Sequence, residues 1–336
     1  MSAHRRLVLA TLLLAFCVIV VGAYVRLSDA GLGCPDWPLC YGRAVPGGEL
    51  GASASQRAWK EMAHRYLAGG LGLLILAVFV LSWKRREGTA LSGALLLVVA
   101  CQATLGMWTV TLLLRPAIVA AHLLGGMATL TLLLWLFLSL GSHTSAPETR
   151  ALRLPALAAL LAVVAQIALG GWVSANYAAL GCPDLPLCLG VAVPPMDFHN
   201  AFHVFRELGE TSGGERLPAE ALTAIHWTHR MGALAVFLVA GTFAGMFTVA
   251  CRRAGAGDSV ERKLGRALNW VLLLQLATGL ANVAFSWPLA NAVAHNGGAA
   301  ALALLLAMLC SRLTLRAHAE PQTLAQRSAP AVAQGA

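Results

Sequence analysis

Apolar residues are gathered along this chain into eight long runs, which are separated by shorter polar segments. Each run is close to the roughly 20 residues that a helix needs to cross a bilayer. None shows the alternation of polar and apolar residues that is typical of a barrel strand. The pattern therefore predicts an all-α polytopic membrane protein with eight transmembrane helices, at about residues 7–25, 64–83, 91–114, 117–140, 154–173, 226–250, 264–285 and 289–310.

The composition agrees with this interpretation. Apolar residues make up 58% of the 336 residues, charged residues only 12%, and the mean hydropathy is +0.71. Soluble proteins carry about 25% charged residues, so most of the surface of this chain must face lipid. The first run follows His4, Arg5 and Arg6 and has no small-residue cleavage site after it. We therefore expect it to be retained as a span and not removed as a signal peptide.

The distribution of charge predicts the orientation in the membrane. Eight spans place both termini on one side, and that side contains 15 of the 24 lysines and arginines but only 5 of the 15 acidic residues. An excess of basic residues is typical of cytoplasmic loops. We therefore expect a multi-pass protein of the cell inner membrane with both termini in the cytoplasm. Topology then accounts for the net charge of +9, and no nucleic-acid partner is expected.

The chain contains an internal repeat. The stretch GCPDWPLC at residues 33–40 returns as GCPDLPLC at residues 181–188. Later spans match as well, each pair of spans at its own constant offset in residue number. The paired residues are Gln102 with Gln275, Gly106 with Gly279, His122 with His295, and His64-Arg65 with His229-Arg230. The repeat predicts two tandem, pseudo-symmetric four-helix bundles that are related by an axis along the membrane normal.

These boundaries define the expected organisation. We predict an N-terminal four-helix half, a cytoplasmic linker, a C-terminal four-helix half and a cytoplasmic tail without fixed structure, at residues 1–140, 141–153, 154–312 and 313–336. The second half has a long outer segment at residues 174–225. Its stretch MDFHNAFHVFRELG has phenylalanines at helical spacing, which predicts an amphipathic helix on the membrane surface that covers the second site or docks a partner. His199 and His203 lie in this stretch, and we favour solvent-facing histidines over a metal site.

Four cysteines lie in the repeated loops on the outer side, where thiols oxidise. The short spacing, with two prolines between partners, predicts the disulfides Cys34–Cys40 and Cys182–Cys188. A metal pair is the alternative, but CxxC spacing and nearby histidines would suit a metal better.

Four histidines lie at repeat-matched positions in the spans, namely His64, His122, His229 and His295. An ionisable side chain in a span is costly and indicates function, although an interhelical hydrogen bond is the alternative for any single one. Facing histidines from two helices of a four-helix bundle can hold a planar cofactor. Glycines follow each histidine and could leave room for a flat macrocycle, or could simply allow close helix packing. The pattern predicts a haem with two histidine ligands to iron in each half, because a zinc site needs more ligands.

Further polar residues accompany these histidines near the outer side. Arg65 and Arg230 are candidates to pair with haem propionates, or else to extend to the lipid headgroups. Three residues before the shared His-Arg, the halves differ: the first has Glu61 and the second has His226. Glu61 lies on the same helix face as His64 and is a candidate to move protons, with an exposed carboxylate at a helix start as the alternative. The sequence assigns no role to His226.

Several motifs together resemble those of the haem A synthase family, namely YVRLSDAGLGCPDWPLC, EMAHR, AHLLGG, THRMGA and AHNGG. The resemblance covers all eight spans. It implies an oxidoreductase that converts a ring methyl of haem O to a formyl group by successive hydroxylations, which gives haem A for terminal oxidases. It also implies that haem O is the substrate of the N-terminal half and haem b (protohaem) the cofactor of the C-terminal half.

Carried over residue by residue, the resemblance implies that His64 and His122 ligate haem O and that His229 and His295 ligate haem b. It also implies that Glu61 is catalytic. An iron with two histidine ligands has no open position for oxygen. Either one of His64 and His122 leaves during turnover, or the methyl is oxidised by electron withdrawal and then reacts with water. The expected partners are membrane lipid, haem O and an electron donor, with the haem O synthase and a second copy of the chain as further candidates.

Two other functions fit the histidines, namely a non-catalytic di-haem cytochrome b and a haem carrier. All four histidines lie towards one face of the membrane, whereas a transmembrane electron carrier needs haems towards both faces. Glu61 occurs in one half only, which favours an enzyme over both alternatives.

Overall fold

The structure is a computed structural model that describes residues 1–47, 51–141, 150–253 and 260–327. Within these ranges every regular secondary-structure element is a helix, which confirms the predicted fold class. The eight long helices are each long and apolar enough to cross a membrane. They are α1 (Ala3–Leu27), α2 (Ala52–Arg85), α3 (Thr89–Thr111), α4 (Pro116–Ser139), α5 (Arg153–Ala175), α7 (Ala219–Arg253), α8 (Val260–Ala284) and α9 (Leu289–Arg327), and the two short ones are η1 (Arg150–Leu152) and α6 (Phe198–Ala201).

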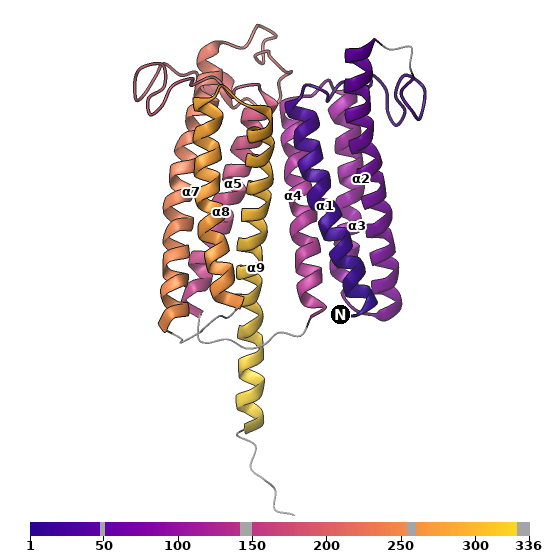
Figure 1. The fold of residues 1–336 in the computed structure, drawn as a ribbon, viewed down its shortest axis with the longest axis vertical. Helices are drawn as coiled ribbons and strands as arrows, with labels where there is room; N and C mark the ends of the chain where they lie inside the picture. The colour runs from indigo at the N-terminus through magenta and orange to yellow at the C-terminus, as the bar shows by residue number, and fades with distance from the viewer. Residues whose placement is uncertain (48–50, 142–149, 254–259, 328–336) are drawn as a thin grey trace, which may run out of the picture.

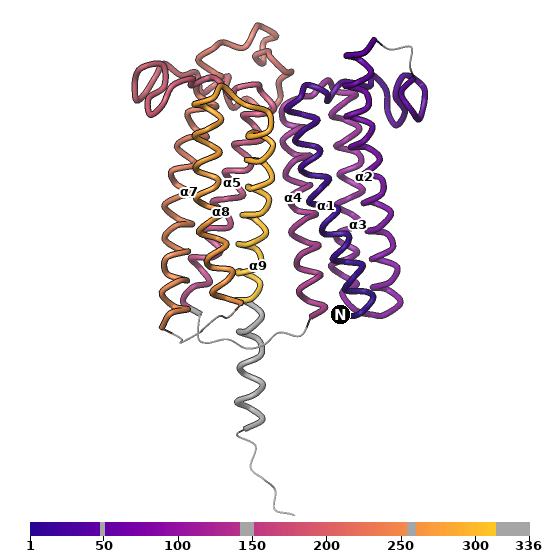
Figure 2. Tube along the Cα trace, viewed as in Figure 1, coloured from indigo at the N-terminus to yellow at the C-terminus, as the bar shows by residue number. Residues whose placement is uncertain are grey.

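The long helices form two groups that stand side by side (Figures 1 and 2). In the first group α1 contacts α2 and α4, and α3 also contacts α2 and α4. In the second group α5 and α8 each contact α7 and α9 in the same way. The contacts of each group therefore close a ring of four helices, in which α2 faces α4 and α7 faces α9 across the centre. This arrangement is consistent with the predicted pair of four-helix bundles.

The two groups meet along α1, α4, α5 and α9. The contacts α1 with α9 and α4 with α5 are equivalent under the repeat, and α4 also contacts α9. Glycines lie at this seam: a methyl group at Gly171 of α5 would lie 2.8 Å from Leu123 Cδ2 of α4, and one at Gly297 of α9 would lie 3.4 Å from Val20 of α1. Small residues thus let the helices of the two halves approach closely, as is usual in membrane bundles.

Polar contacts join the halves at the end that carries the long loops, which we name the loop end (described residues 28–47 and 176–218; upper end in Figure 1). Arg26 of α1 donates to the carbonyl oxygens of Ser174 (2.7 Å) and Ala175 (3.3 Å) at the end of α5, and its guanidinium lies over the ring of Tyr177. The start of α1 is at the opposite end (Figure 1).

Helices α2 and α7 begin earlier than the apolar runs predicted, at Ala52 and Ala219 in place of residues 64 and 226. The first turns of α2 contain polar residues with good helix propensity, such as Gln56, Arg57 and Lys60, and those of α7 include Glu220 and Thr223. An apolar run marks only the part of a helix that contacts lipid or core, so it does not show the turns that project beyond it. Both helices consequently reach into the loop end.

The predicted amphipathic helix of the outer segment is wrong. Only Phe198–Ala201 is helical, and Phe205 is 92% exposed. The indole of Trp172 donates to the carbonyl of Ala201 at 2.9 Å, and Arg206 is buried where it donates to Asn176 Oδ1 at 2.5 Å. These contacts with α5 turn the chain inward after one turn of helix, and a regular helix along the surface could not make them.

Helix α9 continues to Arg327, beyond the predicted end of the last span at residue 310. The predicted tail therefore begins with helical residues, and residues 328–336 lie outside the described residues. Part of the predicted linker, residues 142–149, lies outside them as well, and its end is occupied by η1.

Candidate functional site

The four repeat-matched histidines lie inside the bundles, one pair in each half. His64 comes from α2 and His122 from α4, which face each other across the first ring of helices. His229 of α7 and His295 of α9 have the same arrangement in the second ring. The imidazoles of each pair are close enough to interact electrostatically. The structure therefore brings together the histidines of each pair.

Each of these imidazoles packs against a glycine on a neighbouring helix. The glycines are Gly22 of α1, Gly106 of α3, Gly170 of α5 and Gly279 of α8. A methyl group at these positions would lie 2.8, 3.3, 3.1 and 3.4 Å from the Cε1 atoms of His64, His122, His229 and His295, respectively. At Gly22 this contact is shorter than any side chain tolerates. Glycine thus lets the rings lie directly against the backbone of the next helix.

The ring nitrogens show which atom an imidazole can offer to a metal. In His64 and His122, Nδ1 is buried and has no hydrogen-bond partner in the described part of the chain, so Nε2 is the nitrogen that faces accessible space. In the second half, Thr278 Oγ1 lies 2.8 Å from His295 Nδ1. That contact likewise occupies Nδ1 and leaves Nε2 available.

The donor set fits a haem in each half. Two imidazoles from facing helices of a four-helix bundle are what a haem with two histidine ligands requires. Nε2 is available in His64, His122 and His295, and in His229 the amide nitrogen of Gln166 lies 3.0 Å from Nδ1 and 3.4 Å from Nε2. Among the described residues, no group of three or more histidines, cysteines or carboxylates could hold a metal ion. A zinc ion needs three or four protein ligands, so the alternative zinc site is not supported.

The glycines that follow the histidines do not all leave open space. Gly69 and Gly70 have no side chain or neighbouring backbone within 4 Å of the position of a methyl group. In contrast, a methyl group at Gly125, Gly232 or Gly298 would overlap a glutamine side chain, namely that of Gln102, Gln166 or Gln275, respectively. These three glycines therefore admit a glutamine from the adjacent helix, and the prediction that they open space for the macrocycle is wrong.

Alanine at Gly22 should weaken haem binding in the N-terminal half by about 10-fold, because the new methyl group would push the ring of His64 out of place. The matched control is Gly69→Ala. Alanine there stabilises the helix by the same amount, up to about 1 kcal/mol, and its methyl group enters open space. Titration of each purified variant with haem and measurement of its absorbance would compare them. Equal affinities in both variants would contradict the prediction.

Glu61 is buried at the loop end of the first bundle, with 4% of its surface exposed. Its Oε2 accepts the N–H of Cys34 at 2.8 Å, and its Oε1 pairs with Arg65 at 2.5 Å. The alternative of an exposed carboxylate at a helix start is wrong, because α2 begins at Ala52. The carboxylate is instead held in one orientation, one turn nearer the loop end than His64.

His226 occupies the equivalent place in the second half. Its Nδ1 accepts the N–H of Cys182 at 3.1 Å, as Glu61 accepts that of Cys34. The imidazole therefore replaces the carboxylate as the anchor of the loop but carries no fixed negative charge. The two halves have the same architecture here and different chemistry.

Arg65 and Arg230 fasten the repeated loops. Arg65 donates to the carbonyl oxygens of Asp36 (2.9 Å) and Leu39 (2.8 Å). Arg230 donates in the same way to three carbonyl oxygens, those of Cys182 (2.6 Å), Asp184 (2.9 Å) and Leu187 (2.9 Å). The predicted pairing with haem propionates stays a prediction, and the structure assigns both guanidinium groups a further task in the loops.

Each repeated loop is closed by a disulfide, Cys34–Cys40 in the first half and Cys182–Cys188 in the second. An aspartate inside each loop binds two backbone N–H groups: Asp36 accepts those of Tyr41 (2.6 Å) and Gly42 (2.8 Å), and Asp184 accepts those of Leu189 (2.7 Å) and Gly190 (2.8 Å). Each loop thus holds its own shape and packs against α2 or α7 at Arg65 or Arg230, the residue after the histidine.

Comparison with known proteins agrees with this description. Residues 5–309 match the model of the COX15-CtaA family, described as cytochrome oxidase assembly protein. The chain belongs to this family. It is 40% identical over 315 residues to a protein named "Heme A synthase" from Shewanella oneidensis, and the alignment covers 88% of this chain and 92% of the relative. It is also 29% identical over 337 residues to a "Heme A synthase" from Methylobacterium radiotolerans, and that alignment covers 90% of this chain and 87% of the relative.

In this member of the COX15-CtaA family, the aspartate anchors should depend on pH. Slight desolvation opposes ionisation of Asp36, but the N–H groups of Gly42 and Tyr41 outweigh it and hold its pKa below the ordinary 3.8. The N–H of Gly190 is the largest cause that lowers the pKa of Asp184. A lowered folded-state pKa means that the anchor stabilises the loop fully above about pH 4 and is lost as the pH falls below the ordinary value.

Asp36→Asn should therefore let tris(carboxyethyl)phosphine reduce Cys34–Cys40 several-fold faster at neutral pH, while Cys182–Cys188 is unaffected. Asp184→Asn should have the reverse effect, so each variant is the control for the other. Mass spectrometry of the alkylated thiols would follow both rates. In the unmodified protein both rates should rise only below about pH 4, and a rise at higher pH would contradict the assignment.

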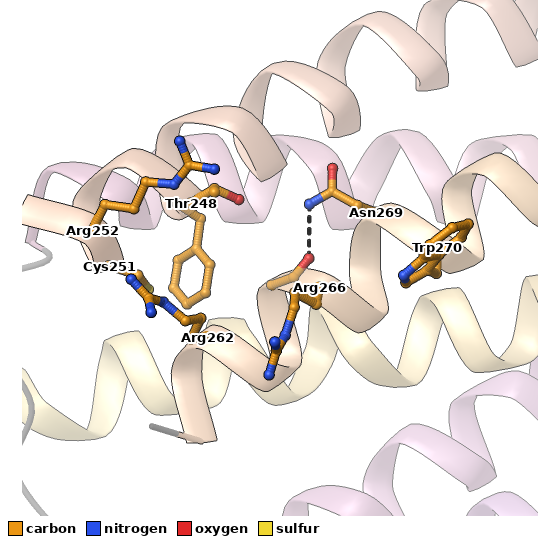
Figure 3. A pocket seen from close by; sticks show the side chains of 9 residues that line it. Thr248, Cys251, Arg252, Arg262, Arg266, Asn269 and Trp270 are labelled. Carbon is orange, nitrogen blue, oxygen red and sulfur yellow. Dashed lines mark hydrogen bonds between the residues drawn. The ribbon is translucent and has the colours of Figure 1, made fainter. Parts of the chain in front are cut away.

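The pocket of about 450 Å³ between α7 and α8 is a separate feature of this family member (Figure 3). It is lined by residues that include Cys251, Arg252, Arg262 and Arg266, near the ends of α7 and α8 that are remote from the loop end. Its lining contains no histidine among the described residues, so it is distinct from both histidine pairs.

Sequence reasoning missed several residues of the site, which are Gly22, Gly170, Gln166 and Thr278. The repeat contained a signal for two of them, because Gly22 matches Gly170 at the offset of the repeated loop. No such signal exists for the other two, because each is present in one half only.

Proposed function

We propose that this protein is a haem A synthase, which oxidises a ring methyl of haem O to a formyl group through a hydroxymethyl intermediate. The observation that carries the proposal is the buried Glu61–Arg65 pair one turn from His64, which the second half replaces with His226. Two histidine pairs on one scaffold, of which one has an added carboxylate, suit one reacting haem and one haem that transfers electrons. The names of the relatives support the same function.

In this proposal the N-terminal half holds haem O through His64 and His122, and the C-terminal half holds haem b through His229 and His295. When bound, haem b supplies an iron that can accept and donate single electrons. The asymmetry of the loop end supports the assignment, because the only buried carboxylate beside a described histidine pair is Glu61.

The side chains of the first half have distinct tasks. His64 and His122 orient the ring of the substrate between α2 and α4. Arg65 pairs with Oε1 of Glu61 at 2.5 Å, and Cys34 N–H donates to Oε2, so both oxygens are held in place. The carboxylate is then positioned to accept a proton that is released when the methyl is oxidised. The closed loop over α2 excludes bulk water from this place.

We infer that both termini lie in the cytoplasm and that the loop end, with both haem sites, faces the extracytoplasmic side. The excess of basic residues at the terminal end supports this orientation, and the two disulfides of the loop end suit an oxidising compartment. Membrane lipid surrounds the bundles. The further partners in this proposal are an electron donor and the haem O synthase that supplies the substrate.

The competing function is a di-haem cytochrome or haem carrier, which would explain the histidines but not Glu61. Acid-acetone extraction and mass spectrometry of the protein, co-expressed with a source of haem O, decides between them. We expect haem O together with haem A or the hydroxymethyl intermediate. Protohaem alone, in a protein with full haem content, would overturn the synthase and leave the cytochrome.

A further inference from the structure

The two halves differ in what holds the imidazole rings. In the second half Thr278 Oγ1 lies 2.8 Å from His295 Nδ1 and donates its own hydrogen to the carbonyl of Leu274, also at 2.8 Å. Because its hydrogen is used in this way, the hydroxyl accepts the proton of Nδ1. The tautomer of His295 is thereby fixed with Nε2 free for iron, and the ring cannot turn without losing this hydrogen bond.

Gln166 of α5 holds the other ring of this half. Its amide Nε2 lies 3.0 Å from His229 Nδ1 and donates to the His229 carbonyl at 2.9 Å. Its Oε1 is buried without a partner in the described chain. Ligation of iron through Nε2 requires a proton on Nδ1. Half a turn of the amide would place Oε1 on that proton, in exchange for the hydrogen bond to the His229 carbonyl. Gly232 admits this side chain, since a methyl group there would overlap Oε1.

The first half has neither residue. At the offsets of the repeat, Val18 stands in place of Gln166 and Leu105 in place of Thr278, and Leu67 stands in place of Gly232. An aliphatic side chain cannot accept a proton from an imidazole.

The buried Nδ1 atoms of His64 and His122 consequently lack a hydrogen-bond partner among the described residues. The carbonyl of Gln102 lies near His122 but does not meet hydrogen-bond geometry. The ring of His64 is thus placed by packing against Gly22, and the ring of His122 by packing against Gly106 beside the carbonyl of Gln102.

We propose that Gln166 and Thr278 are positioning residues that keep haem in the C-terminal half permanently, and that their absence from the N-terminal half lets its haem exchange. The inference rests on the proposed function, which assigns the four histidines as ligands. A substrate must enter and its product must leave, whereas a resident cofactor must not. Hydrogen bonds to the second nitrogen of ligating histidines fix the ring and make it a stronger ligand.

The test compares Thr278→Val with Thr278→Ser, since valine keeps the shape and serine keeps the hydroxyl. The rate at which haem passes from each purified protein to excess apomyoglobin measures retention, and a spectroscopic redox titration measures the potential. Thr278→Val should release the C-terminal haem about 10- to 100-fold faster and should raise its reduction potential, because the ligand donates less electron density to ferric iron. Thr278→Ser should behave as the unmodified protein does. Gln166→Leu should change haem release and reduction potential in the same directions as Thr278→Val.

The reciprocal change is Leu105→Thr, which gives His122 the partner that His295 has. It should slow haem release from the N-terminal half, and a mere packing role of Thr278 would not produce this gain. Unchanged release and potential in both Thr278→Val and Gln166→Leu would overturn the inference, and so would a loss in Thr278→Ser equal to that in Thr278→Val. These readouts need no turnover: if extraction finds only protohaem, the proposed function fails while the comparison of release rates still gives its answer.

Discussion

Replacement of Glu61 with glutamine should lower haem A formation by about 10²- to 10⁴-fold, the range for loss of a general acid or base, and should leave haem binding intact. Glutamine can still accept the N–H of Cys34 through its amide oxygen, so the loop stays anchored. It loses the negative charge that pairs with Arg65 and can no longer accept a proton. Haem O or the hydroxymethyl intermediate should therefore accumulate, as measured by acid-acetone extraction and mass spectrometry.

The matched control is His226→Gln, at the equivalent place of the second half. Glutamine can again accept the N–H of the loop cysteine, there Cys182. This variant should form haem A at nearly the normal rate, because no fixed charge is removed. If Glu61→Gln made haem A as fast as His226→Gln does, Glu61 would have no catalytic role and its burial would serve the loop alone.

Removal of single ligands should separate the two haems. His229→Ala should lose protohaem from the C-terminal half and all haem A formation, because the imidazole across the bundle, His295, cannot hold the iron alone. His64→Ala should keep protohaem and also lose haem A formation. Pyridine haemochrome spectra give the haem content, and extraction gives the identity of the pigment.

His199→Ala and His203→Ala are the controls for these variants. Both residues lie in the outer segment, and their rings are adjacent to each other, with centroids 6.4 Å apart. Haem content and haem A formation should not change in either. A loss of protohaem in His64→Ala as complete as in His229→Ala would contradict the assignment of separate haems to the two halves.

The spans could be predicted well because burial in lipid leaves a simple apolar signal along the chain. The same signal did not show where α2 and α7 begin, since their first turns project out of the apolar layer. It was misleading for residues 196–209, where helical spacing of phenylalanines suggested a surface helix. The conformation of that segment is determined by the hydrogen bonds of Arg206 and Trp172, which join residues far apart in sequence. Periodicity contains no information about such contacts.

The histidine pairs could be predicted because the repeat presents each functional position twice. Residues that belong to one half only were harder to interpret. His226 had no assignment until its contact with Cys182 was seen, and Thr278 and Gln166 looked like ordinary polar residues of a span. Which side chain meets which ring depends on the rotation of each helix in its bundle, and a single sequence does not specify that rotation.

The contact of Arg26 with the carbonyl of Ser174 bears on how such a chain can arise. These residues occupy the same position in the two copies of the repeat, 148 residues apart. In a two-fold arrangement, a residue meets its own counterpart only at the axis. Had the halves been separate, identical polypeptides, arginine would have faced arginine there, and like charges repel. Fusion of the genes lifts that restriction, because each side of the axis can then mutate on its own.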